Sequence, residues 1–112
     1  MKIVIRARDL ELTPDLRDRV RRRTLFALGR LGPAVRTVDV TLADVNGPRG
    51  GVDKLCRMRI KGDHLPAVVI EATDVELGAA IDAAAERAGR TVVRARERRR
   101  GFATVPRLVP QA

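Results

Sequence analysis

The chain alternates between two hydrophobic periods, and the order of these periods constrains its fold more than any other feature does. Four segments alternate apolar and polar residues with a period of two, which is typical of half-buried strands. They lie at 2–7, 37–42, 56–61 and 68–72. Two further segments repeat apolar residues at spacings near 3.6, which predicts helices over 14–31 and from 73 to about 99. The predicted order of elements is therefore β-α-β-β-β-α.

Capping and turn residues delimit these segments. Thr13 carries a hydroxyl group directly before Pro14, a combination that favours the start of a helix. Gly32-Pro33 supplies the end of that helix, and Thr73-Asp74 can cap the second one. The glycine-rich stretch 46–51 interrupts two strand patterns and is expected to join them as a hairpin loop.

The order of elements predicts an α+β fold with two layers. A helical crossover between the first two strands makes them parallel, whereas the later hairpins are antiparallel. We therefore expect a four-stranded mixed sheet with both helices on one face and solvent on the other. The length of 112 residues suits one domain, which we place at residues 1–100. The segment 101–112 has two prolines and no periodicity, and is expected to be a flexible C-terminal tail.

The chain is strongly basic, with 23 Lys+Arg against 14 Asp+Glu and a formal net charge of +9. Such an excess favours a polyanionic partner, either nucleic acid or an anionic membrane surface. No apolar run approaches the roughly 18 residues of a membrane span, and the N-terminus lacks the pattern of a secretory signal. Cys56 has no second cysteine to pair with, which fits a reducing compartment. These features favour a soluble protein of the cytoplasm.

Arginines on the predicted helices gather in stripes. At about 100° per residue, four arginines of the second helix fall within a stripe roughly 80° wide, beside its alanine-rich face. They are Arg87, Arg90, Arg94 and Arg98, and the acids Asp82, Glu86 and Glu97 lie further round the solvent side. On the first helix, the similar stripe comprises Arg19, Arg23 and Arg30 with Phe26 among them, and the opposite flank carries Arg17 and Arg21.

These stripes have two interpretations. Exposed arginines are ordinary solubilising residues whose stems cover apolar surface. Separation of cations from acids, however, is poor for pairing within a helix and good for contact with phosphate oxygens, which the guanidinium group can bind through two donors. The chain has no Tyr or Trp and only two Phe, Phe26 and Phe102, so base stacking on an aromatic sheet face is nearly excluded. We therefore expect recognition of RNA shape and backbone.

No constellation in the sequence supports catalysis. His64 stands in a predicted turn without a second histidine, so neither a metal site nor an acid-base pair is expected. Cys56 lies on the apolar face of its strand and is expected to be a buried hydrophobic residue rather than a nucleophile. Residues 47–50 match a GxxG string but join two strands, whereas a KH domain needs two helices there. An enzyme is the least expected class, and no metal, cofactor or small-molecule substrate is predicted.

Three short motifs occur in an order that is found in a known family. They are Leu10-Glu11-Leu12-Thr13-Pro14-Asp15-Leu16-Arg17, then Ala72-Thr73-Asp74, then Ala80-Ile81-Asp82 before a basic helix end. With these motifs the chain resembles the ribosome hibernation-promoting factors and ribosome-associated inhibitors of the sigma-54 modulation protein family, over roughly residues 1–100. It departs from the family in having Val75-Glu76-Leu77 where an aromatic is usual, and in having arginine in place of most lysines.

The resemblance implies a fold similar to double-stranded RNA-binding domains, with the small ribosomal subunit and its 16S-type rRNA as partner. Such a protein would be a cytoplasmic, ribosome-associated monomer that occupies the decoding region, blocks mRNA and tRNA binding, and inhibits translation under stress or in stationary phase. A short form ending near Ala112 is not expected to pair two ribosomes unaided. From the stripes and the resemblance together, the candidate RNA-binding residues are Arg17, Arg19, Arg23, Arg30, Arg87, Arg90, Arg94, Arg96, Arg98, Arg99 and Arg100.

Two alternative functions use the same features differently. A general module for structured or double-stranded RNA would have the same fold and the same charge. A protein-interaction module would instead use the open face of the sheet, where the docking patch would comprise Val4, Val69, Arg57 and Arg59.

Overall fold

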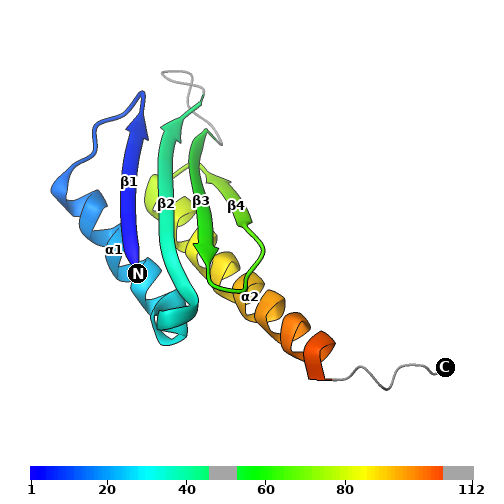
Figure 1. Cartoon of the computed structure of the whole chain (residues 1–112). Helices are drawn as coiled ribbons and strands as arrows, with labels where there is room; N and C mark the ends of the chain where they lie inside the picture. Colours follow the sequence, from blue (N-terminus) through cyan, green and yellow to red (C-terminus); the bar gives the residue numbers. More distant parts are fainter. Residues whose placement is uncertain (46–52, 105–112) are drawn as a thin grey trace.

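The computed structural model describes residues 1–45 and 53–104, with side chains in the last helix up to Arg98. Its elements follow one another as Figure 1 shows. The strands are β1 (Lys2–Arg8), β2 (Val35–Asp44), β3 (Lys54–Gly62) and β4 (Val68–Asp74). The helices are α1 (Pro14–Leu28), the short 3₁₀ segment η1 (Gly29–Ala34) and α2 (Leu77–Thr104). The loop predicted at 46–51 lies outside the described residues.

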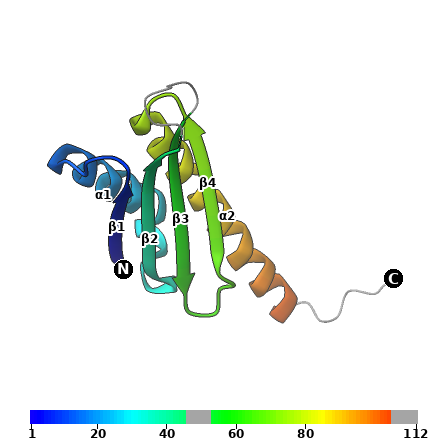
Figure 2. The same cartoon turned by 90° about the horizontal axis from the view of Figure 1, so that it is seen from above.

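The four strands form one mixed sheet in the order β1-β2-β3-β4. β1 runs parallel to β2, whereas β3 is antiparallel to both of its neighbours. α1 and α2 cover the same face of this sheet (Figure 1, Figure 2). The predicted α+β fold, with its β-α-β-β-β-α order and its parallel first pair of strands, is therefore confirmed.

The core lies between the sheet and the helices and is built from the alternating strand residues. Val38, Val40 and Leu42 of β2 are fully buried, as are Cys56 and Met58 of β3. The side chains that α2 adds to this layer are mostly small and include Ala80, Ala84, Ala85 and Ala88. Short side chains let the helix backbone lie close to the sheet, as the alanine-rich pattern predicts.

α1 begins where the sequence predicts but ends earlier. The Thr13 hydroxyl accepts a hydrogen bond from the Leu16 backbone N–H at 3.2 Å, and a proline takes the first helical position. The helix expected over 14–31 ends at Leu28 and continues as η1. Gly32-Pro33 blocks a longer helix, because proline disfavours the α conformation in the residue before it, and Gly32 has non-helical angles (φ 6°, ψ −85°).

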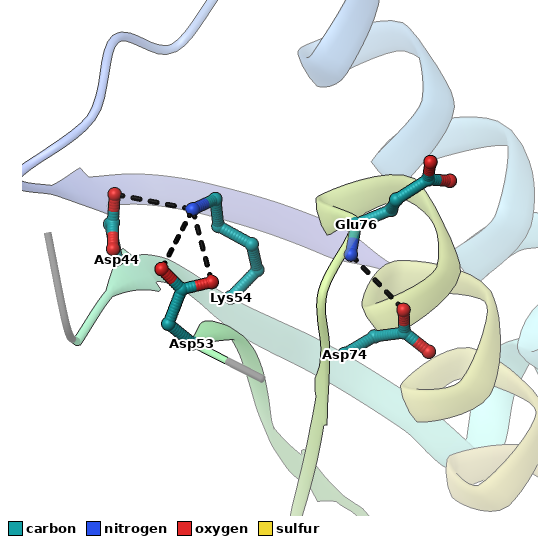
Figure 3. Close-up of polar contacts among 5 residues, drawn as sticks. All are labelled: Asp44, Asp53, Lys54, Asp74 and Glu76. Carbon is teal, nitrogen blue, oxygen red and sulfur yellow. Dashed lines mark hydrogen bonds and ion pairs between the residues drawn. The ribbon is translucent and has the colours of Figure 1, made fainter. Parts of the chain in front are cut away.

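α2 begins and ends later than its pattern predicts. Thr73 and Asp74 are still paired with β3 in the sheet, so they extend β4 instead of capping the helix directly. Asp74 Oδ1 then accepts a hydrogen bond from the Glu76 backbone N–H at 3.0 Å in the turn before α2 (Figure 3). At its other end α2 continues to Thr104, into the segment predicted to be a tail. The rest of that segment, 105–112, lies outside the described residues.

The buried carboxylate of Asp53 accepts hydrogen bonds from Lys54 at the end of the β2–β3 strand pair (Figure 3). The Asp53 side chain is only 1% exposed, and Lys54 Nζ donates to both of its oxygens at 3.1 Å and to Asp44 Oδ2 at 3.3 Å. The hydrogen bond to Asp53 is the main cause that raises the pKa of Lys54. Hydrophobic periodicity carries no signal for such a cluster, and sequence reasoning missed it.

Candidate nucleic-acid interface

α1 and α2 lie side by side behind the sheet (Figure 1). Between them the surface holds a groove of about 670 Å³. The helices are in close contact at Gly89 of α2, where a Cβ atom would lie 3.1 Å from the Ala27 carbonyl oxygen of α1. Gly89 therefore permits an approach that any side chain would strain. The groove is lined by Arg23, Phe26, Ala27, Arg30, Glu86, Gly89, Arg90, Val93 and Arg94.

Arginines outnumber acids on this groove by four to one. Arg30 and Arg94 are exposed and form no ion pair or hydrogen bond within the described part of the chain. Arg90 Nη1 lies 3.4 Å from Glu86 Oε1, one helical turn earlier. An exposed pair of this kind is worth only ~0–1 kcal/mol, so a phosphate group can compete for Arg90. The groove is therefore a surface where an anion is favoured.

Arg23 and Phe26 together form the α1 side of the groove. The Arg23 Cζ atom lies 5.7 Å from the centroid of the Phe26 ring, within the range of a cation–π contact. Arg23 Nε is 3.3 Å from Asp82 Oδ1, but the geometry makes no hydrogen bond, and this buried N–H has no other partner among the residues described. Phe26 is 81% exposed. This side of the groove thus presents a cation and an aromatic ring.

Asp82 of α2 joins the two helices through Arg19 of α1. Arg19 Nη2 donates to Asp82 Oδ2 at 2.7 Å, and Arg19 Nε donates to Asp82 Oδ1 at 3.3 Å. These hydrogen bonds raise the pKa of Arg19. The sequence placed Asp82 on the solvent side of its helix, and this expectation was wrong because the carboxylate faces α1. Arg19 is accordingly directed at α2 and does not line the groove.

The arginine stripe predicted on α2 divides in the folded chain. Arg90 and Arg94 line the groove, whereas Arg87 Nη1 donates to the Glu71 carbonyl oxygen at 2.6 Å and so crosses to β4. Arg96 lines a second hollow, of about 400 Å³, that also borders η1 and the turn between β3 and β4. Only part of the predicted stripe therefore converges on one surface.

The remaining predicted arginines lie near the helix ends. Arg17, in the first turns of α1, and Arg98, late in α2, are both exposed. Arg99 and Arg100 lie in α2, but their side chains fall outside the described set. Arg30 lines both the groove and the second hollow, and therefore connects the two.

The open face of the sheet carries the residues of the alternative docking patch. One cross-strand row comprises Val4, Asp39, Arg59 and Val69. Val69 is 55% exposed. In the next row Arg57 Nη2 lies 2.6 Å from Glu71 Oε2, so Arg57 already has a carboxylate partner. This face is therefore a natural control surface for charge substitutions on the groove.

His64 and Cys56 lie where the sequence placed them. His64 is exposed in the turn before β4, with a φ of 58°. Cys56 is buried, and loss of solvent raises the pKa of its thiol to about 12. Over residues 1–45 and 53–104, no group of three His, Cys, Asp or Glu side chains is placed to hold a metal ion. No helix in that part of the chain is long and apolar enough to cross a membrane.

Comparison with known proteins identifies the family. The family model described as sigma 54 modulation protein / S30EA ribosomal protein matches residues 3–100. The chain belongs to this family. One similar solved structure is the N-terminal domain of Protein Y from Thermus thermophilus, which is 25% identical in sequence to this S30EA family member. The match has a TM-score of 0.70 and covers 84% of this chain and 98% of that one.

A second solved structure shares the fold of this S30EA family member. It is a ribosomal subunit interface protein from Coxiella burnetii, which is 11% identical and has a TM-score of 0.70 over 87% of this chain and 99% of that one. No curated protein sequence matches the chain significantly.

Membership in the S30EA family confirms the resemblance that the three sequence motifs indicated. It indicates a ribosome-associated protein rather than a known class of enzyme. The matched region contains every residue that lines the groove. Two motif residues also acquire physical roles in this family member: Asp74 hydrogen-bonds the turn before α2, and Asp82 holds α2 to α1.

Proposed function

We propose that this S30EA family member is a ribosome hibernation factor that binds the small ribosomal subunit at its decoding region. The observation that carries the proposal is the arginine-rimmed groove between α1 and α2, where Arg30 and Arg94 have no carboxylate partner among the residues described. Family membership supports a ribosomal partner. The net charge of +9 supports binding to its 16S-type rRNA.

Inhibition of translation under stress would then be competition, without bond chemistry. Arginines of both helices would hold rRNA phosphates and fix the orientation of the domain. The close-packed layer between helices and sheet would make the domain a rigid wedge, located where mRNA and tRNA must sit. Because tRNA and this protein would need the same space on the subunit, binding of one would exclude binding of the other.

The predicted arginines divide into two proposed roles. Those that face the groove, the second hollow or solvent would contact RNA, namely Arg17, Arg23, Arg30, Arg90, Arg94, Arg96 and Arg98. Arg19 and Arg87 would instead position α2, against Asp82 and against the Glu71 carbonyl respectively. Contact through Arg99 and Arg100 stays a prediction, as does a monomeric, cytoplasmic protein.

Sedimentation with purified small subunits tests the proposal. Replacing Arg90, Arg94 and Arg98 by Glu is expected to abolish pelleting and to leave the circular dichroism spectrum unchanged. The matched control replaces three exposed arginines of the opposite face, Arg6, Arg57 and Arg59, by Glu and should still pellet. Excess tRNA should release the wild-type protein from the subunits. Undiminished pelleting of the groove variant would contradict the proposal.

Two other functions predict different results in the same assay. A general module for structured RNA would bind arbitrary duplexes as tightly as it binds ribosomes at matched salt. A protein-interaction module on the open face is supported by the exposed side chain of Val69. It would bind its partner with little dependence on salt, because apolar contacts are not screened by ions.

A further inference from the structure

Phe26 is an unusually exposed aromatic ring at the edge of the groove. It is 81% exposed, a larger fraction than any other large hydrophobic residue reaches in the described part of the chain. The Arg23 Cζ atom lies over the ring, 5.7 Å from its centroid, and so places a second planar group on one face of it. Aromatic rings and guanidinium planes are the surfaces on which unstacked RNA bases stack in proteins.

The groove beside Phe26 combines an apolar floor with a cationic rim. Ala27, Gly89 and Val93 contribute the apolar part, and the rim holds Arg30 and Arg94, which have no ion-pair partner among the residues that the structure describes. Its volume of about 670 Å³ falls within the range of roughly 300–1,000 Å³ that is usual for small-molecule sites. Contact with phosphates alone would need no apolar floor. The combination suits a ligand with a flat apolar face next to a negative charge.

An unstacked nucleotide has this chemistry, whereas the bases of a continuous duplex are hidden in the stack. We propose that the groove receives one unstacked nucleobase of a structured RNA, stacked on Phe26, while Arg30 and Arg94 bind the flanking phosphates. This nucleobase site deepens the proposed function, and it rests on that function where it takes the RNA to be rRNA. It adds a preference for a bulge or loop over a fully paired stem.

The test compares two RNA hairpins that differ by one nucleotide: a fully paired stem and the same stem with a single bulged adenosine. The wild-type protein should bind the bulged hairpin more tightly at matched salt. Phe26→Ala should weaken binding to the bulged hairpin by about 5- to 150-fold, the range for alanine replacement of a stacking aromatic, and leave binding to the paired hairpin unchanged. Leu25→Ala is the control, because Leu25 is 50% exposed on the same helix but does not line the groove.

NMR gives a second readout. The ring protons of Phe26 should move upfield when the bulged hairpin is added and stay in place with the paired one. The inference would be overturned if Phe26→Ala lost the same binding affinity for both hairpins, or lost affinity for neither. So would an acidic leucine-containing peptide that competes as well as the bulged hairpin, because the groove would then be a site for a protein segment.

The hairpins also separate this inference from the proposed function. If the wild-type protein fails to pellet with small subunits but prefers the bulged hairpin through Phe26, the ribosomal function is wrong and the nucleobase site stands. If it pellets, and Phe26→Ala changes neither pelleting nor hairpin preference, the nucleobase site is wrong and the ribosomal function stands.

Discussion

Neutralising Arg30 and Arg94 should reduce the salt dependence of ribosome binding by an amount that can be worked out from the groove. Neither side chain is paired within the described part of the chain, so each can replace a counterion on rRNA. The slope of log K against log salt is negative, and each lost phosphate contact makes it shallower by about 0.7 to 0.9. The slope of the Arg30→Gln/Arg94→Gln variant should therefore be shallower than that of the wild type by about 1.4 to 1.8. The affinity advantage of the wild type should therefore shrink roughly tenfold between about 50 and 200 mM salt.

Co-sedimentation with small subunits over a salt series measures this slope. The control is Arg57→Gln/Arg59→Gln, which removes the same charge from the open face of the sheet. Neither residue lines the groove, and Arg57 is already paired with Glu71 at 2.6 Å, so this variant should keep close to the wild-type slope. Equal loss of slope in the two variants would refute the reasoning, since binding would then follow the net charge and not the groove.

Three buried features of the fold make further predictions. Gly89→Val should lower the free energy of unfolding in urea by about 1–3 kcal/mol through overpacking against α1, whereas Gly29→Ala, with nothing within 4 Å of its Cβ position, should not. Folded protein should resist alkylation of Cys56 near pH 8, and unfolded protein should react, because burial raises the thiol pKa from 9.0 to about 12. Since the folded state holds this proton more tightly, the thiol's contribution to stability is complete below about pH 9 and is lost as the pH rises toward 12. Lys54→Met should lower the Tm by leaving the buried Asp53 carboxylate without its ammonium partner, and an unchanged Tm would contradict that role.

Helical periodicity was enough to predict that Arg90 and Arg94 share one side of α2, and the structure places both in the groove. The same periodicity grouped Arg87 with them, although its guanidinium group reaches the Glu71 carbonyl. The angle of a residue around the helix axis says where its side chain starts. It does not say where a long, flexible side chain ends.

The sequence by itself determined the order of elements, the parallel first pair of strands, the Thr13 cap and the alanine-rich layer of the core. These follow from periods, caps and crossover rules that act over a few residues or one connection. Only the tertiary structure decided which arginines have partners within the described part of the protein and which have none there. Arg19 and Asp82 are 63 residues apart in the chain, and the contact of Gly89 with Ala27 likewise joins two separate helices. Such partners are set by how the helices pack on the sheet, for which local periodicity carries no signal.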